Sequence, residues 1–149
     1  GVVFDTQAPT MRHEEFADYK VNREKMPEEL AASLPIIKNL IKAFNIPVLY
    51  KDGFEADDVI GTLAKAAEKE NFTVYMMTPD KDFAQLVSEN IFMYKPARMG
   101  NEAQIWGIPE VLEKFQIDHP KQVIDILGLW GDAVDNIPGI PGIGEKRSK

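Results

Sequence analysis

Acidic side chains recur where the predicted helices and strands begin or end, and carboxylates are side chains that can bind metal ions for catalysis. They are Asp5, Glu55, Asp57, Asp58, Asp80, Asp82, Asp132 and Asp135. The chain has no cysteine and two histidines, so these carboxylates would select hard cations such as Mg²⁺ or Mn²⁺. Two such ions about 3.5–4 Å apart are common machinery for cutting phosphodiesters. The sequence therefore allows a two-metal site, provided that the acids converge.

Each acidic group also has an ordinary structural interpretation. Acids at the start of a helix, as in Glu55–Asp58, cap the helix and complement its dipole. The run Asp80-Lys81-Asp82 is typical of a solvated turn, and Asp132 with Asp135 fits an N-cap and its neighbour. These alternatives stay open until convergence is tested.

Glycines and basic residues provide candidate contacts to phosphate. The segment NIPGIPGIGEK places Gly139, Gly142 and Gly144 where the backbone can turn sharply and approach a partner. Amide groups in such turns can bind phosphate oxygens. Lys146, Arg147 and Lys149 follow this segment, and Arg12, Lys20, Arg23 and Lys25 form a second basic cluster. The alternatives are a surface loop and a solvated helix face. A net charge of −7 can thus coexist with nucleic-acid binding, because basic groups flank the acids.

The hydrophobic pattern predicts an α/β fold. Strands are expected at residues 2–4, 46–50, 73–77 and 91–96, and helices within 11–25, 26–44, 55–69, 81–89, 108–115 and 120–130. Pro35 predicts a kink or a late start in the second of these helices. Alternating strands and helices predict a mainly parallel central sheet flanked by helices, followed by a helical C-terminal part. Asp5, Asp80 and Asp82 would then lie at the carboxyl ends of strands, where open α/β sheets bind ligands.

Composition limits the class of protein. The 149 residues suit one domain, and 44% hydrophobic residues suffice for a core. The sequence contains no apolar run long enough to span a membrane, and it begins without the pattern of a signal peptide. The absence of cysteine excludes a disulfide scaffold. These features predict a cytoplasmic protein without a membrane partner.

Five stretches, in this order, carry a resemblance to a known family: VVFDTQAPTMRHE, YKVNR with MPEEL, GFEADDVIGTLA, TPDKDFAQLV, and GDAVDNIPGIPGIGEK. The chain resembles the 5′–3′ exonuclease domain of bacterial DNA polymerase I, within the 5′-nuclease and flap-endonuclease superfamily. The resemblance spans nearly the whole chain. The stretch KPARMGNEAQIWG, within residues 95–107, is less typical, and no function is assigned to it.

The resemblance implies a PIN-like, resolvase-like core that cuts DNA by a two-metal mechanism in replication and repair. It implies that the eight acids bind two Mg²⁺ ions, for which Mn²⁺ can substitute. Lys20 and Arg23 match catalytic residues that steer the scissile phosphate. Arg12, Lys20 and Arg23 would contact DNA. The turn with Gly139, Gly142, Gly144 and Lys146 matches a helix-hairpin-helix element, in which backbone groups and a K⁺ ion contact the phosphates of duplex DNA. The implied partner is a 5′-flap, nicked or 5′-ended duplex DNA, in the bacterial cytoplasm with the nucleoid.

The resemblance also sets expectations about domains. It implies a nuclease core at residues 1–107 and, at 108–149, a helical part with the start of the helix-hairpin-helix element. Family members have a preceding strand with a further metal-ligand aspartate, and a polymerase domain in the same parent chain. We therefore expect a core that lacks its N-terminal strand and a fragment that is inactive by itself.

Two other functions are compatible with these residues. A PIN-type ribonuclease also uses clustered acids and Mg²⁺, but it would prefer single-stranded RNA. A non-catalytic duplex-DNA-binding fragment would use the glycine turn, and its acids would be structural.

Overall fold

The computed structural model describes residues 1–98 and 100–148, which form two compact units. Unit 1 comprises Gly1–Val59 and Val134–Asn136, and unit 2 comprises Ile60–Ala133 and Ile137–Lys149. Helix α3 (Ala56–Lys69) crosses the division between them. Each unit is described by itself.

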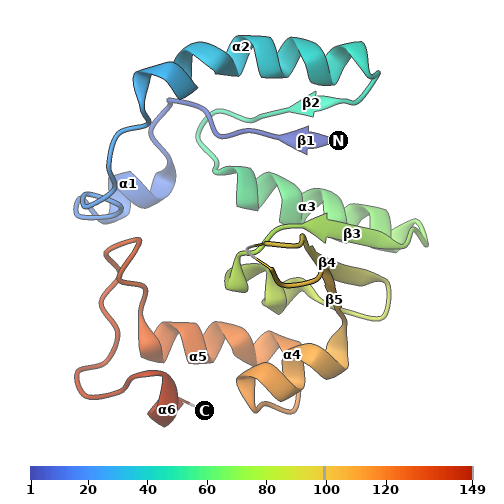
Figure 1. The fold of residues 1–149 in the computed structure, drawn as a ribbon. Helices are drawn as coiled ribbons and strands as arrows, with labels where there is room; N and C mark the ends of the chain where they lie inside the picture. Colours follow the sequence, from blue (N-terminus) through green and yellow to red (C-terminus); the bar gives the residue numbers. More distant parts are fainter. Residues whose placement is uncertain (99, 149) are drawn as a thin grey trace. The chain divides into compact units, whose positions relative to one another are not determined.

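Unit 1 is a small parallel sheet with helices. Besides the first turn of α3, its elements are β1 (Val2–Val3), α1 (Met11–Glu15), α2 (Glu28–Ala43) and β2 (Val48–Leu49). Val2 pairs with Val48 and Val3 with Leu49 in a parallel register. Helix α2 lies alongside β2 (Figure 1). The predicted strand at 2–4, which ends just before Asp5, and the strand at 46–50 are both confirmed.

Helix α2 is continuous through its proline. It begins with Glu28 and Glu29 in the first turn, where acids complement the helix dipole. Pro35 lies inside the helix, so the alternative of a late start was wrong. Proline removes one backbone hydrogen bond.

Unit 2 contains a three-stranded sheet and most of the helices. After α3, its elements are β3 (Val74–Met77), η1 (a 3₁₀ helix, Lys81–Leu86), β4 (Ile91–Lys95), β5 (Gln104–Trp106), α4 (Ile108–Phe115), η2 (a 3₁₀ helix, Pro120–Gln122), α5 (Val123–Trp130) and α6 (Glu145–Ser148). The strand order is β3-β4-β5. Strands β3 and β4 pair in parallel, and β4 and β5 pair antiparallel.

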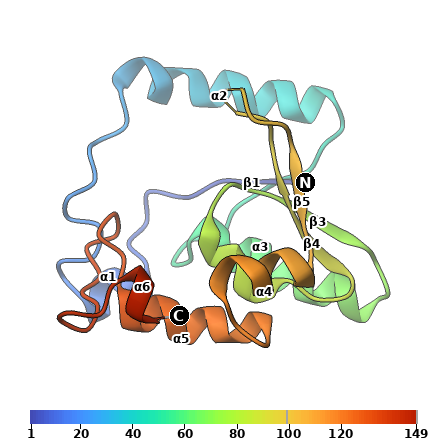
Figure 2. The ribbon, with the colours of Figure 1, turned by 60° about the horizontal axis from the view of Figure 1, so that its bottom comes forward.

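The hydrophobic core of unit 2 joins this sheet to the helices. Ile91 and Met93 of β4, Val111 of α4 and Val123 of α5 are fully buried. Ala64 of α3 belongs to the same cluster. Figure 2 shows α4 and α5 lying side by side in this unit. The sheet and the helices therefore support the loops that follow β3 and α5.

Two elements of unit 2 differ from the sequence prediction. Residues 81–89 were expected to form an α-helix, but a 3₁₀ helix ends at Leu86 and extended backbone follows at Val87. Phe83 and Ala84 are adjacent and both buried, which suits a tight 3₁₀ turn. Strand β5 lies in the stretch to which no element was assigned. It forms because Met93, Tyr94 and Lys95 of β4 offer an antiparallel edge.

The α/β class and the mainly parallel pairing are confirmed, with the described strands paired as a two-stranded and a three-stranded sheet. Among the described residues, no helix is long and apolar enough to cross a membrane.

Candidate functional site

The first predicted acids meet at the N-terminal end of α3 in unit 1. Asp5 follows β1, and its Oδ1 accepts a hydrogen bond from the amide of Ala56 at 2.7 Å. The Asp58 carboxylate accepts from the amide of Glu55 at 3.0 Å. Both bonds satisfy amides at the start of the helix. The structural role of these acids as caps is therefore real, and it coexists with their position at a strand end.

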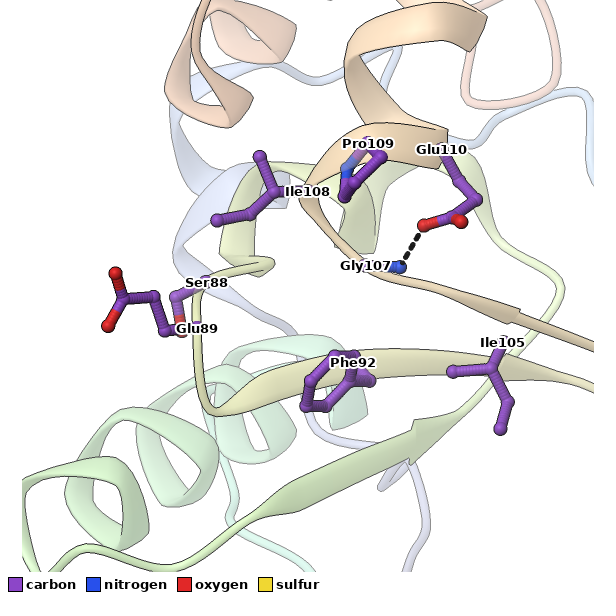
Figure 3. A pocket seen from close by; sticks show the side chains of 8 residues that line it. All are labelled: Ser88, Glu89, Phe92, Ile105, Gly107, Ile108, Pro109 and Glu110. Atoms are coloured by element: carbon purple, nitrogen blue, oxygen red, sulfur yellow. Dashed lines mark hydrogen bonds between the residues drawn. The ribbon is translucent and has the colours of Figure 1, made fainter.

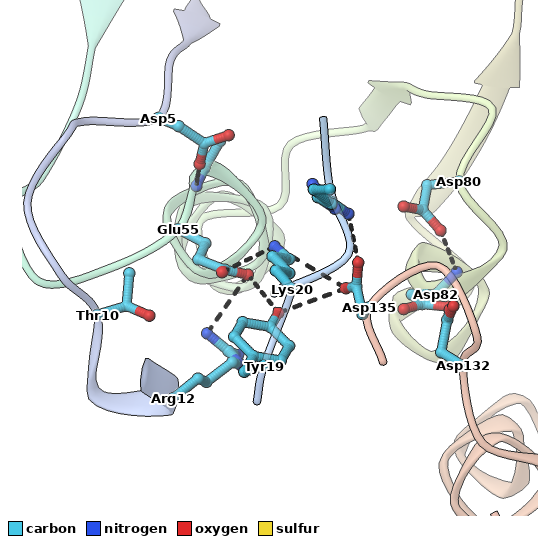
Figure 4. Close-up of polar contacts among 12 residues, drawn as sticks. Asp5, Thr10, Arg12, Tyr19, Lys20, Glu55, Asp80, Asp82, Asp132 and Asp135 are labelled. Atoms are coloured by element: carbon cyan, nitrogen blue, oxygen red, sulfur yellow. Dashed lines mark hydrogen bonds and ion pairs between the residues drawn. The ribbon is translucent and has the colours of Figure 1, made fainter. Parts of the chain in front are cut away.

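Glu55 is the least exposed of the paired unit 1 acids; two side chains donate hydrogen bonds to it, and Arg12 Nη1 lies 3.7 Å from its Oε2. Its side chain accepts from Tyr19 Oη at 3.0 Å and from Lys20 Nζ at 2.8 Å (Figure 4). Tyr19 is itself buried, and burial together with the charge of Glu55 raises the pKa of its hydroxyl. The hydroxyl therefore stays protonated and remains a donor at neutral pH.

Arg12 forms a two-pronged ion pair with Asp58. Its two terminal nitrogens donate to the two carboxylate oxygens at 2.7 Å each. The bond from Arg12 lowers the pKa of Asp58 and outweighs the effect of burial. The planar fork of arginine matches a carboxylate, so this pair fixes the orientation of both groups.

Asp135 joins the same network from the far end of the sequence. Its carboxylate accepts from Arg23 at 2.5 Å, lies 3.8 Å from Lys20 Nζ and lies 3.4 Å from Tyr19 Oη. The backbone carbonyl of Asp135 accepts from the amide of Lys20 at 2.9 Å. Lys20 has a φ of 57°, a left-handed conformation that is unusual for lysine. The segment 19–23 is therefore held in place by Asp135 and Glu55.

Unit 2 contains a second group of predicted acids, after β3. The Asp80 carboxylate caps η1 by accepting from the amide of Asp82 at 3.0 Å. Burial raises the pKa of Asp82, and the nearby charges of Asp80 and Asp132 add to this, while Lys81 opposes it. Crowding of carboxylates in a partly buried place is a cost that a cation relieves.

Lys81 supplies such a cation. Its Nζ donates to Asp132 Oδ2 at 2.6 Å and to Asp82 Oδ1 at 3.1 Å. Burial alone would lower the pKa of Lys81, but the bonds to Asp132 and Asp82 outweigh it and raise the pKa. Lys81 thus joins a loop after β3 to the segment after α5.

The backbone around Asp132 is held by a close approach of two glycines. Asp132 and Ile137 exchange hydrogen bonds of 2.9 and 2.7 Å. A Cβ on Gly139 would lie 2.2 Å from the carbonyl oxygen of Trp130, and Gly131 has a φ of 78°. No side chain fits there. The structure therefore gives Gly139 a packing role, beside its predicted role in DNA binding.

The rest of the glycine turn is more open. Gly142 has a φ of 82°, and its carbonyl accepts from Arg147 at 3.0 Å. A Cβ on Gly144 would meet nothing within 4 Å. Lys146 lies exposed in α6, and Lys149 lies outside the described residues, as does Met99 of the 95–107 stretch. Contact of this turn with DNA stays a prediction.

The structure brings together Asp5, Glu55, Asp58 and Asp135 in unit 1, and Asp80, Asp82 and Asp132 in unit 2. Asp57 lies exposed in the first turn of α3. Within residues 1–98 and 100–148, no three acidic or histidine side chains are close enough together to hold a metal ion as they stand. Salt bridges with lysine and arginine take up carboxylate oxygens instead. The assignment of the eight acids as metal ligands stays a prediction.

A separate hollow lies on unit 2, away from these predicted residues. It measures about 370 Å³ and is lined by β4, β5 and the start of α4, including Phe92, Ile105 and Ile108 (Figure 3). Glu110 accepts from the amide of Gly107 there at 2.8 Å and so caps α4. None of the predicted site residues lines this hollow.

Two known families match successive segments of the chain. Residues 1–116 match the family described as the 5′-3′ exonuclease, N-terminal resolvase-like domain. Residues 118–149 match the 5′-3′ exonuclease, C-terminal SAM fold. The chain belongs to the 5′-3′ exonuclease family. The resemblance found in the sequence is thereby confirmed.

Two relatives of this chain are bacterial proteins. It is 45% identical over 148 residues to DNA polymerase I of Rhizobium leguminosarum, covering 99% of this chain and 14% of the relative. It is 44% identical over 147 residues to the 5′-3′ exonuclease of Aquifex aeolicus, covering 99% of this chain and 49% of the relative. The chain therefore spans about half, or much less, of the relatives it matches.

Solved structures show the same fold. A T5 5′-exonuclease with bound zinc matches with a TM-score of 0.77 at 25% identity, over 99% of this chain and 56% of the other. The T5 flap endonuclease in a complex with DNA and metal ions matches with a TM-score of 0.77 at 25% identity, over 99% and 56%. The catalytic core of Rad2 in complex with a DNA substrate matches with a TM-score of 0.55 at 20% identity, over 98% and 44%, and shows the fold alone.

Sequence reasoning did not identify two residues of these networks. Tyr19 directly precedes Lys20, but nothing in its neighbourhood marks it as the donor to Glu55. Lys81 was read as part of a solvated turn. A lysine in the first turn of a helix opposes the helix dipole, and that mismatch was the available signal.

Proposed function

We propose that this chain is part of a structure-specific 5′-nuclease that hydrolyses DNA phosphodiesters with two divalent metal ions. The match of residues 1–116 to the 5′-3′ exonuclease family carries the proposal. The acids at the ends of β1, β3 and α5 and at the start of α3 support it, because they lie where an α/β fold presents ligands.

The donor set suits a hard divalent cation. All the proposed ligands are carboxylates, and burial, with the nearby charges of Asp80 and Asp132, raises the pKa of Asp82. A metal ion bound here would activate water and stabilise the leaving oxygen. The T5 relatives were solved with metal ions, zinc in one case. We propose Mg²⁺ as the natural ion, with Mn²⁺ as a substitute, and Asp5, Glu55, Asp57, Asp58, Asp80, Asp82, Asp132 and Asp135 as its ligands.

Lys20 and Arg23 are the proposed catalytic residues. In the structure they bind Glu55 and Asp135, with Nζ of Lys20 at 2.8 Å and Arg23 at 2.5 Å from these carboxylates. Both groups can also bind a phosphate, since lysine provides a mobile charge and arginine a planar fork. They would therefore orient the scissile phosphate beside the acids that they now hold.

The proposed substrate is duplex DNA with a 5′ flap, a nick or a 5′ end. The turn with Gly139, Gly142, Gly144 and Lys146, with K⁺, would contact phosphates without reading base sequence. Residues 1–107 would be the catalytic core and 108–149 the DNA-binding part. By analogy with the polymerase relatives, the activity would serve DNA replication and repair in the bacterial cytoplasm, in a parent chain that carries a polymerase domain.

Cleavage of labelled substrates tests this proposal. The chain is assayed in two forms. One is the chain by itself, and the other is a chimera in which it replaces the matching 147 residues of the Aquifex exonuclease. The chimera is needed because the chain covers only 49% of that relative. A 5′-flap duplex is incubated with Mg²⁺, Mn²⁺ or EDTA. In the Aquifex context we expect cutting near the flap junction with either metal and none with EDTA, whereas the chain by itself should cut little or not at all.

Two comparisons separate this proposal from its alternatives. Faster cutting of single-stranded RNA than of flap DNA would favour a PIN-type ribonuclease. Tight, metal-independent binding of duplex DNA without cleavage, in both contexts, would favour a non-catalytic fragment and would contradict the nuclease.

A further inference from the structure

Lys81 lies between two proposed metal ligands that come from distant parts of unit 2. Its Nζ is 2.6 Å from Asp132 Oδ2 and 3.1 Å from Asp82 Oδ1. The Lys81 side chain is 35% exposed, that of Asp132 is 20% exposed and that of Asp82 is 42% exposed. Water therefore screens the contact with Asp132 less than the contact with Asp82, so the charge of Lys81 matters most to Asp132.

The sequence position of Lys81 is locally unfavourable. It begins η1 directly after the N-cap Asp80, where the backbone amides present partial positive charge. A cation in this first turn gains nothing from its own helix. Its placement is explained by Asp132, which lies 51 residues away in the sequence and comes to the same place through the segment after α5.

The ammonium group contacts one oxygen of Asp82 and one of Asp132, and a divalent ion bound by these two carboxylates would have to compete with it for those oxygens. Two carboxylates within 3.1 Å of one nitrogen would repel each other without a cation between them. An ammonium and a divalent ion cannot both hold these oxygens at close range, because the two cations repel. Lysine carries its charge on a flexible stem, so it can withdraw when another cation arrives.

We propose that Lys81 is a built-in counter-cation, which holds Asp82 and Asp132 together in the metal-free protein and competes with the divalent ion for them. The inference rests on the proposed function in one respect, namely that these carboxylates bind a divalent ion. It goes beyond that function because it assigns the lysine between two ligands a role in setting metal affinity.

An ordinary structural salt bridge makes a different prediction. If Lys81 only stabilises the loop, then its loss weakens the folded chain equally with and without metal. If Lys81 competes with the metal, its loss weakens the metal-free chain and tightens metal binding. Metal affinity and metal-induced thermal shift therefore distinguish the two roles without any activity assay.

The test is titration of the 149-residue chain with Mn²⁺, followed by electron paramagnetic resonance of free Mn²⁺, with melting curves in EDTA and in excess Mn²⁺. Lys81→Met removes the charge and keeps most of the length. Lys81→Gln is a second neutral variant that can still donate to a carboxylate, in case the first folds poorly. Lys65→Met is the matched control, because Lys65 pairs with Glu68 on α3, away from the proposed ligands.

We expect Lys81→Met and Lys81→Gln to bind Mn²⁺ about 5- to 30-fold more tightly than the natural chain, as expected for removal of one positive charge near a divalent ion. Their melting temperature should fall in EDTA, and the shift produced by Mn²⁺ should be larger. Lys65→Met should match the natural chain in affinity and shift.

If the natural chain binds Mn²⁺ and the Lys81 variants bind it equally well or more weakly, this inference is overturned. The proposed nuclease function is not affected by that result. Failure of every protein to bind Mn²⁺, both by itself and in the Aquifex context, would overturn both. Binding by the variants but not by the natural chain would support the inference in its strongest form.

Discussion

The two units neutralise their acids in different ways. In unit 1, Arg12, Lys20 and Arg23 contact Asp58, Glu55 and Asp135, and the Tyr19 hydroxyl adds a neutral donor. In unit 2, Lys81 spans Asp82 and Asp132. The first arrangement distributes positive charge over several side chains, and in the second one flexible side chain contacts both carboxylates. Loss of one member should therefore disturb unit 1 less than loss of Lys81 disturbs unit 2. The following predictions test this contrast.

The largest effect is expected at Asp80. Asp80→Asn removes a proposed metal ligand but keeps the cap of η1, because asparagine caps helices as well as aspartate does. In the Aquifex context, cleavage of a 5′-flap substrate should fall by at least about 100-fold, the range for losing one charge-stabilising group. The melting temperature should stay nearly unchanged. Flap cleavage at the natural rate would remove Asp80 from the metal site.

A substitution at Gly139 should disturb the backbone that positions Asp132 in unit 2 without changing any charge. Gly139→Ala places a Cβ 2.2 Å from the Trp130 carbonyl oxygen, so it should lower the free energy of unfolding by about 3 kcal/mol. Gly144→Ala is the matched control and should change it by less than about 0.5 kcal/mol, since its Cβ meets nothing within 4 Å. Urea denaturation measures both. Equal effects would show that the close approach at Gly139 is not a constraint.

The network of unit 1 should absorb the loss of one neutral donor. Tyr19→Phe leaves Glu55 with Lys20 as a partner, so the free energy of unfolding should fall by about 1–2 kcal/mol rather than more. Tyr50→Phe, at a side chain that is 62% exposed, should cost less than about 0.5 kcal/mol. A loss above about 4 kcal/mol would mean that Tyr19 alone holds the network.

The smallest effect is the pH dependence of the Arg12–Asp58 pair. Because Arg12 lowers the pKa of Asp58, the pair stabilises the folded chain above about pH 4 and loses this contribution as the pH falls through the lowered pKa. Arg12→Met should therefore be less stable than the natural chain at pH 7, by less than about 1 kcal/mol for such a partly exposed pair. The difference should shrink toward pH 3 in urea unfolding. A difference independent of pH would mean that Arg12 acts through packing.

Local sequence patterns predicted most of the elements. Helix α3 (Ala56–Lys69) has acids at its start, lysine at its end and an apolar face, so all its signals agree. The segment 81–89 was harder, because the spacing of Phe83, Ala84 and Val87 fits both an α-helix and a 3₁₀ turn followed by extended chain. Strand β5 depends on pairing with β4, and the residues of β5 do not by themselves predict this pairing.

The candidate site was predicted as a set of residue types but not as a set of contacts. The acids were identified from their positions at element ends. The ion pairs of these acids could not be identified from the sequence, because Arg23 and Asp135 are 112 residues apart in the chain and Lys81 and Asp132 are 51 residues apart. Basic residues assigned to DNA instead bind carboxylates in this structure. Contact of these basic side chains with DNA stays a prediction.

Paramagnetic broadening by Mn²⁺ tests the central claim most directly, namely that the acids of both units bind divalent metal. Amide signals of the isotope-labelled 149-residue chain are recorded at low Mn²⁺-to-protein ratios. If both groups of acids bind metal, signals near Ala56 and Asp58 and near Asp82 and Ala133 should broaden first. Earliest broadening at acids outside the two groups, such as Asp118 and Asp125, would contradict it.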